Sequence, residues 1–156
     1  MSELTLNLVV SDAIKAMKFY EKVFGATRDE VYHFPNRSNS NEANVIVGGV
    51  SLRLIDENAD FGCSPSKEDE TSSIWLEIEV EDAESTLKKA SIHGAKVEQE
   101  LSEFMGTLNA QITDPYGYVW TINQVLKEVT FEERYRFYEE LHSEMEEEEE
   151  EQEQDD

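Results

Sequence analysis

The chain has 156 residues, of which 38% are hydrophobic, and its formal net charge at pH 7 is −23. This length fits one domain, or one domain followed by a tail. The charge argues against nucleic acid as a partner, because Lys and Arg supply that affinity by neutralising phosphates. It favours a cationic or neutral ligand. The one cysteine, Cys63, excludes a disulfide framework within the chain and a thiolate metal cluster.

The N-terminus lacks a basic region followed by an apolar run, so no signal peptide is predicted. No apolar stretch approaches the length of a membrane span. We therefore expect a cytoplasmic protein without a membrane partner.

The first half of the chain predicts a strand, a helix and three further strands. Residues 4–10 alternate apolar and polar side chains, which is typical of a strand. An amphipathic helix follows, with Asp12 as its N-cap and Gly25 as the residue that ends it. Residues 28–34 form the next predicted strand, and residues 44–55 form a hairpin around a Gly-Gly pair.

The second half repeats this order after a long polar stretch. Residues 56–73 have no periodicity and are predicted to be a loop, of a kind that is often functional or mobile in a compact domain. A strand over 74–80, a helix over 83–93 capped by Asp82 and a strand over 96–100 are predicted after it. A hairpin follows, with strands over 108–112 and 118–123 and the turn Asp114-Pro115-Tyr116-Gly117.

The two halves are repeats of one pattern. The stretch Leu6–Ala13 recurs as Leu76–Ala83, with the same alternation and the same Asp-Ala ending, and each following helix ends in Gly-Ala. Two copies indicate a duplicated half-domain. We assign residues 1–125 to one domain, with repeats over about 3–57 and 74–125, and residues 126–156 to a C-terminal helix and acidic tail.

The C-terminal segment combines an apolar helical face with an acidic run. Thr130 and Glu133 have the spacing of a capping box. The face is formed by Phe131, Tyr135, Tyr138, Leu141 and Met145. We expect this helix to dock on the body or on a partner chain, and the run from Glu146 onward to repel itself and fray. A solvated solubility tail is the simplest interpretation of that run.

Three stretches resemble the vicinal oxygen chelate superfamily, which includes glyoxalase I, the bleomycin- and fosfomycin-resistance proteins and the extradiol dioxygenases. They are Asp12–Ala26, Val80–Ala95 and Asp114–Trp120, which holds the DPxG turn. The helix ending Phe19–Ala26 looks most like the PhnB-like members. The resemblance implies an α+β fold, in which two βαβββ repeats form a cupped mixed sheet of about eight strands with helices on the outer face. The C-terminal helix and acidic tail lie outside it.

Metal-dependent members of that superfamily place His or Glu at four cavity-facing positions. Carried over to this sequence, the positions fall on residues that are poor metal ligands: Thr5, Arg53 (or its neighbour Ser51), Trp75 and Thr121. The histidines fit surface or capping roles better than a metal site. We therefore expect no metal, no cofactor and no catalytic residue at these positions.

The face of the sheet opposite the helices is predicted to be a polar cup. We expect Arg53 and Glu77 to form an ion pair across it, because buried charges are normally paired. The predicted ligand-cavity residues are Thr5, Asn7, Arg53, Trp75, Glu77, Gln111, Thr121 and Asn123.

Three functions remain open from the sequence. The favoured one is a non-catalytic member that binds a small molecule, cationic in charge, in the cup. The second is a metal-dependent lyase or dioxygenase of the glyoxalase kind, with a displaced site that uses His33, Glu77 and Glu79. The third is an interaction protein that acts through its acidic tail. The resemblance also implies a homodimer, since cups of this family are often completed by a second chain.

Overall fold

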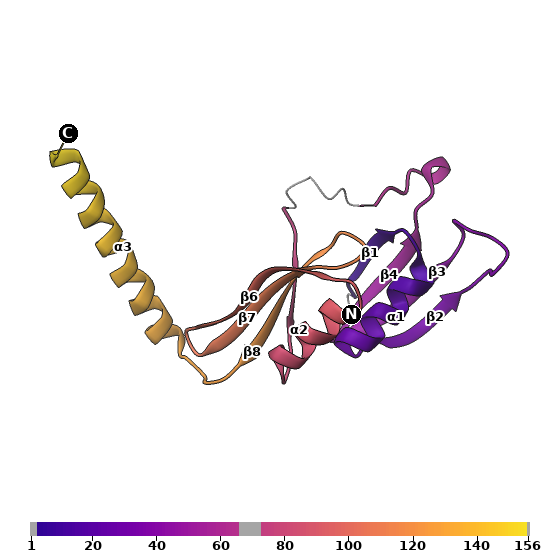
Figure 1. The fold of residues 1–156 in the computed structure, drawn as a ribbon, viewed down its shortest axis with the longest axis horizontal. Helices are drawn as coiled ribbons and strands as arrows, with labels where there is room; N and C mark the ends of the chain where they lie inside the picture. Colours follow the sequence, from indigo (N-terminus) through magenta and orange to yellow (C-terminus); the bar gives the residue numbers. More distant parts are fainter. Residues whose placement is uncertain (1–2, 66–72, 156) are drawn as a thin grey trace.

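The computed structural model describes residues 3–65 and 73–155, which form two four-stranded mixed sheets (Figure 1). Sheet 1 has the order β1-β4-β3-β2 and comprises β1 (Thr5–Val10), β2 (Thr27–Tyr32), β3 (Glu42–Val47) and β4 (Val50–Asp56). Sheet 2 has the order β5-β8-β7-β6 and comprises β5 (Leu76–Glu79), β6 (Lys96–Phe104), β7 (Thr107–Thr113) and β8 (Val119–Val125). In each sheet the first strand pairs in parallel with the fourth, and the other pairs are antiparallel. The predicted α+β fold of two repeats is confirmed, with the eight strands divided between two sheets.

Each sheet carries one helix, and the sequence sets where both helices begin. The helices are α1 (Ala13–Phe24) on sheet 1 and α2 (Ala83–Ile92) on sheet 2. Asp12 accepts a hydrogen bond from the Lys15 amide, and Asp82 accepts one from the Ser85 amide, each at 3.0 Å. Both residues are therefore the predicted N-caps. Gly25 ends α1 in the left-handed conformation, as predicted.

The last strand of each unit also holds the start of its helix. Asp56 at the end of β4 accepts a hydrogen bond from the Ala13 amide at 2.7 Å. In the second unit Gln124 on β8 accepts one from the Ala83 amide at 2.8 Å. These bonds satisfy an amide that has no partner within its helix. In both units the last strand therefore supplies the acceptor for the first amide of the helix, through a carboxylate in one unit and a side-chain amide in the other.

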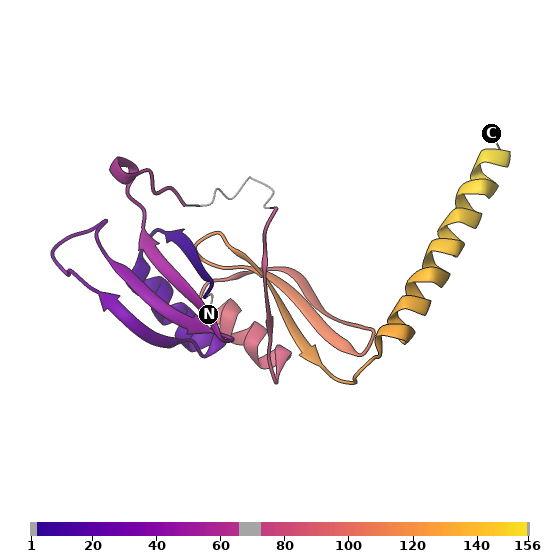
Figure 2. The same cartoon turned by 180° about the vertical axis from the view of Figure 1, so that it is seen from behind.

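The core lies between the sheets and their helices. It comprises the apolar side chains on the helix-facing side of the strands, together with Ala13, Ile14, Ala16, Met17, Phe19, Tyr20 and Val23 of α1. In Figure 1 α1 lies in front of sheet 1, and in Figure 2 it lies behind that sheet. The opposite side of each sheet is covered by no helix among the described residues, which leaves two open sheet faces.

Several element boundaries differ from the sequence prediction. β5 begins at Leu76, two residues later than predicted, so Trp75 precedes the strand. β6 continues to Phe104, and only Met105 and Gly106 make the turn into β7. The predicted loop over 56–73 contains a short 3-10 helix, η1 (Ala59–Phe61). Part of that prediction, residues 66–72, lies outside the described residues.

The C-terminal helix α3 (Phe131–Gln154) projects away from the body at the end of sheet 2 (Figures 1 and 2). Thr130 is its N-cap, as predicted, and accepts from the Glu133 amide at 3.2 Å. The prediction of fraying from Glu146 is wrong, because the helix continues to Gln154. Docking on the body is also not observed, since the predicted apolar face is exposed: Phe131 at 71%, Tyr135 at 57% and Met145 at 50%.

A membrane-spanning helix would need a long apolar run. Among the described residues no helix is both long and apolar enough to cross a bilayer.

Candidate functional site: an apolar cavity between the two sheets

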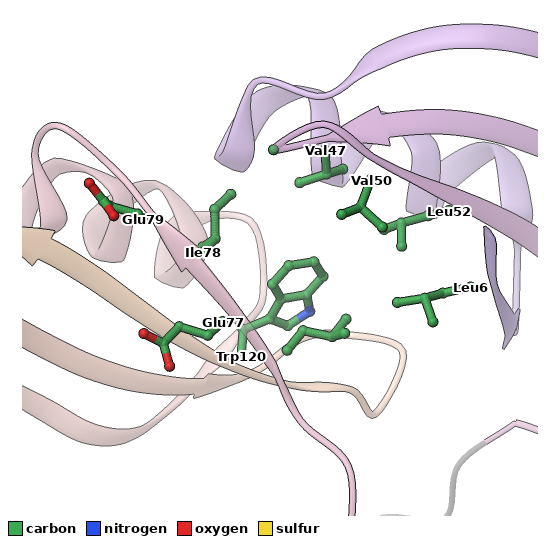
Figure 3. Close-up of a pocket in the computed structure, with 10 residues that line it drawn as sticks. Leu6, Val47, Val50, Leu52, Glu77, Ile78, Glu79 and Trp120 are labelled. Atoms are coloured by element: carbon green, nitrogen blue, oxygen red, sulfur yellow. The ribbon is translucent and has the colours of Figure 1, made fainter. Parts of the chain in front are cut away.

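The candidate site is a cavity of about 230 Å³ at the junction of the two sheets. Sheet 1 contributes residues of β1, β4 and the β3–β4 hairpin, and sheet 2 contributes residues of β5 and β8. The lining is mostly apolar: Leu6, Val47, Val50, Leu52, Leu76, Ile78 and Trp120. Figure 3 shows the side chains of Leu6, Leu52 and Trp120 facing one another across the gap. This cavity is large compared with the roughly 150 Å³ that accommodates a benzene molecule in a protein interior.

Two carboxylates border the cavity. Glu77 and Glu79 alternate along β5 with Leu76 and Ile78, so they lie on the other face of that strand. Figure 3 shows both carboxylates pointing away from the apolar gap. The cavity therefore offers an apolar interior with negative charge at its border, which suits an apolar molecule and favours a positive charge on its outer end.

Trp120 is fixed behind the cavity by a buried hydrogen-bond cluster around Asp114. The Trp120 indole Nε1 donates to Asp114 Oδ2 at 2.9 Å, and the Tyr20 hydroxyl donates to the same oxygen. The amides of Tyr116 and Tyr118 donate to Asp114 Oδ1 at 2.9 and 3.0 Å. Since Tyr20 belongs to α1 and Asp114 to the β7–β8 turn, this cluster joins the two units.

Burial changes the proton affinities in this cluster. Tyr20 is fully buried, and its pKa is raised well above the ordinary value, first by burial and then by the neighbouring Asp114 carboxylate. Burial also raises the pKa of Asp114, although its four hydrogen-bond donors act in the opposite direction. Neither side chain reaches solvent or the cavity to any useful extent, at 0% and 3% exposure. The pair is therefore a structural joint and not an acid–base pair for a substrate.

The predicted ligand-cavity residues fall into two separate groups on the open sheet faces. On sheet 1, Thr5 and Asn7 lie on β1, and the register pairs Asn7 with Arg53. On sheet 2, Thr121 of β8 pairs with Glu77 on one side and Gln111 on the other, and Asn123 lies two residues along. Trp75 stands just before β5 and is 57% exposed. Of the eight predicted residues, only Glu77 also borders the cavity.

The predicted ion pair between Arg53 and Glu77 is wrong. Arg53 Nε instead contacts Glu42 Oε1 at 3.0 Å, on the neighbouring strand β3 of the same sheet. Alternation correctly indicated that Arg53 lies on the open face, but it did not indicate which carboxylate is within reach. Within residues 3–65 and 73–155, Glu77 takes part in no ion pair.

The side chains of this chain do not form a metal site in the part that the structure describes. No three His, Cys, Asp or Glu residues there are placed to hold one ion. The displaced set of His33, Glu77 and Glu79 is not brought together, because His33 follows the outermost strand of sheet 1 and the glutamates lie on β5. At the four positions expected from the resemblance, Thr5, Arg53, Trp75 and Thr121 carry no side chain that is a good metal ligand. A metal of the usual family kind does not fit these residues.

The fold defines a class of protein: two copies of a strand-helix-three-strand unit joined side by side. The sequence model of the Glyoxalase/Bleomycin resistance protein/Dioxygenase superfamily matches residues 4–122, which is most of the chain. This chain belongs to that superfamily.

Individual proteins share sequence or fold with this chain. An uncharacterized protein of Mycobacterium bovis is 27% identical over 136 residues, which are 83% of this chain and 88% of the relative. A Burkholderia phytofirmans enzyme of the same superfamily has a similar structure (TM-score 0.59, 23% identity, covering 80% of this chain and 100% of the other). The fosfomycin resistance protein FosX of Listeria monocytogenes is also similar (TM-score 0.61, 15% identity, 86% and 98%). At these identities the two structures show a shared fold alone.

Two features of the site were missed by sequence reasoning. Leu6 and Leu52 lie on the helix-facing side of their strands, so alternation placed them in the core and gave no sign of a gap between sheets. The bond from Tyr20 to Asp114 links residues 94 positions apart. One signal was present: a tyrosine on the buried face of a helix needs a partner for its hydroxyl.

Proposed function

We propose that this protein is a non-catalytic small-molecule binding protein whose ligand occupies the apolar cavity between the two sheets. The observation that supports it is the cavity itself, with an apolar lining and two bordering carboxylates. The ligand class is a compact apolar or aromatic molecule with a positive charge at one end. A catalytic role is disfavoured because the two buried acids among the described residues are held by groups of the fold. Asp114 accepts from the Tyr20 hydroxyl, and Asp56 accepts from the Ala13 and Asn41 amides.

A matched series of ligands tests the proposed chemistry. The probes are 4-tert-butylbenzylamine as the cation, 4-tert-butylbenzyl alcohol as the neutral analogue and 4-tert-butylbenzoate as the anion. Isothermal titration calorimetry measures binding to the full chain. We expect affinity to fall in the order cation, neutral, anion, with each step about threefold to tenfold. Equal affinity for the three, or no binding of any, would contradict the proposal.

Filling the cavity distinguishes this site from other surfaces. Leu6→Trp places a large side chain in the gap, and we expect binding of the cationic probe to weaken at least tenfold. The matched control is Leu4→Trp, two residues earlier on the same side of the chain, where Leu4 is 72% exposed and outside the cavity lining. The control variant should bind like the original chain.

The carboxylates are tested separately. Glu77→Gln keeps the shape of the border and removes one charge. We expect this variant to lose part of the preference for the cation while binding of the neutral analogue stays the same. Glu3→Gln removes a charge outside the cavity border and should leave the preference intact. If the Glu77→Gln variant kept its full preference for the cation, the proposed role of the Glu77 charge would be contradicted. The proposed role of the apolar lining would be unaffected.

We further propose that the protein forms a homodimer through its open sheet faces. The observation that supports it is that the polar face of each sheet is exposed and is covered by no helix among the described residues. Sedimentation equilibrium measures the mass directly. A homodimer that persists after residues 130–156 are deleted is the expected result, and a monomer at all concentrations would contradict it.

A further inference from the structure

The helix α3 is an exposed arm whose direction is fixed at its root. The amides of Leu126 and Lys127 both donate to the Gly106 carbonyl, at 2.8 and 3.0 Å. The rings of Phe104 on β6 and Phe137 on α3 meet edge to face, with centroids 5.5 Å apart. Figures 1 and 2 show the arm leaving sheet 2 on the side away from sheet 1. Docking of α3 on the distant parts of its own chain would require these contacts to be broken.

The arm carries an excess of negative charge, which destabilises an isolated helix. Residues 131–154 include twelve acids and two arginines, and neither Lys nor Arg occurs after Arg136. Glutamates four residues apart repel one another, and acids near a helix C-terminus interact unfavourably with its dipole. No basic residue lies in the last turn to offset this. A cationic surface beside the second half of α3 would relieve both effects.

A cationic surface of this kind lies on the outer side of α1. Lys15, Lys18 and Lys22 recur at three- and four-residue spacing, so they form one stripe, and all three are exposed. In the described part of the chain none of the three takes part in an ion pair. We refer to these three residues as the lysine stripe. It lies on the helix that covers sheet 1, at the opposite end of the molecule from α3 (Figure 1).

The spacing on the arm matches the stripe in antiparallel orientation. Glu151, Glu148 and Glu144, read toward the N-terminus, are three and four residues apart, as are the three lysines read forward. This orientation also brings the acidic end of α3 to the N-terminus of α1, where negative charge is favourable. We propose that the second half of α3 docks along the lysine stripe of a second copy of this chain. Reciprocal docking of two arms gives a closed pair.

Site-specific cross-linking tests the contact. In a Cys63→Ser background, one sample carries Glu148→Cys and the other carries Lys18→Cys. The two are mixed at low ionic strength and treated with a short bismaleimide. We expect a cross-linked product of twice the chain mass, and we expect it to disappear near 1 M salt, where the screening length is only about 3 Å. Absence of the product at low salt overturns the proposal.

Charge exchange makes the test specific. Adding Lys15→Glu and Lys22→Glu to the Lys18→Cys chain should reduce the cross-link yield at least tenfold. Adding Glu144→Lys and Glu151→Lys to the other chain should then restore it. The matched control is Arg28→Glu with Arg37→Glu, two cations outside the stripe, which should leave the yield unchanged. A cross-link yield that stays the same in the lysine-stripe variants and in the charge-exchanged pair would overturn the proposal. This outcome is independent of whether the chain forms a dimer through the sheet faces.

Discussion

At the residue scale, Asp114 is the side chain on which the joint between the two units depends. It is 3% exposed and accepts hydrogen bonds from Tyr20, Trp120 and two backbone amides. A buried polar group that loses its partner pays its desolvation cost in full. The stability of the joint therefore depends on this one carboxyl more than on any single apolar contact.

Removing that carboxyl should destabilise the fold strongly. Asp114→Ala leaves the Tyr20 hydroxyl and the Trp120 indole N–H without an acceptor, and we expect the free energy of unfolding to fall by about 3 kcal/mol. Asp12→Ala is the matched control, because Asp12 caps α1 at the surface and its loss should cost only about 1 kcal/mol. Urea unfolding followed by circular dichroism measures both. Equal losses in the two variants would contradict the central role of Asp114.

The tyrosines of the joint predict a loss of stability at alkaline pH. Burial raises the pKa of Tyr116 to about 12, and the pKa of Tyr20 and of Tyr118 is raised in the same direction. In the unfolded chain a tyrosine titrates near 10. The folded state thus holds these protons more tightly, so stability is lost as pH rises from about 10 through about 12. Phenolate absorbance at 295 nm, measured beside unfolding, should show this release, and Tyr116→Phe should reduce its amplitude by one group.

At the element scale, the β6–β7 turn and the linker to α3 form one structural unit. Gly106 has φ +78°, and a Cβ at this position would lie 2.5 Å from the Lys127 carbonyl oxygen. Its own carbonyl accepts the amides of Leu126 and Lys127. The turn between two strands of sheet 2 therefore sets the direction in which the arm leaves the body.

Gly106→Ala should loosen the root of the arm. The left-handed backbone alone costs an L-residue about 1–2 kcal/mol, and the clash with Lys127 adds to it. Gly49→Ala is the matched control, because Gly49 has φ +81° but nothing within 4 Å of the added Cβ. We expect Gly106→Ala to be the less stable variant in urea and to be cut faster by trypsin after Lys127. Similar cutting rates in the two variants would show that the turn does not hold the linker.

Local signals in the sequence were enough for the elements but not for the site. Asp12, Asp82 and Thr130 are cap residues whose bonds reach only three positions along the chain, so their role could be predicted from neighbours alone. The choice of Glu42 over Glu77 as the partner of Arg53 depends on the pairing of β3 with β4 and on the division into two sheets. Periodicity assigns a face to each residue and says nothing about how far apart two sheets lie.

The fraying expected for α3 shows a second limit of sequence reasoning. Repulsion among successive glutamates was a sound physical cost, but the contact of Phe137 with Phe104 on β6 gave no sign in the sequence. Glutamate also has a high intrinsic helix propensity. The helix reaches Gln154, and a cationic neighbour, such as the lysine stripe of a second copy, would reduce the remaining cost.

At the scale of the whole molecule, the body and the arm should behave as independent parts. No residue of α3 is buried, and its ring contact with the body is the one between Phe137 and Phe104. Edge-to-face ring pairs contribute about 0.5–1.5 kcal/mol beyond the burial of their area. The two-unit body therefore contains nearly all of the packing on which its stability depends.

Deleting residues 130–156 should leave the body folded. We expect the midpoint of thermal unfolding to change by only a few degrees, because the loss amounts to about 1 kcal/mol. Phe137→Ala in the full chain removes the same ring contact and should give the same change. Differential scanning calorimetry measures both. If the body unfolded at room temperature after the deletion, α3 would stabilise it far more than its exposed side chains indicate, and this prediction would be wrong.

The length of α3 has a hydrodynamic consequence. A helix of 24 residues extends roughly 36 Å at the usual rise of about 1.5 Å per residue. Attached at one end of an already elongated body, it increases the frictional drag without adding much mass (Figure 2). The chain should elute from a sizing column ahead of compact proteins of equal mass. Its true mass in solution is accordingly given by sedimentation equilibrium or light scattering, and a shift toward later elution would report that the arm has folded onto a surface.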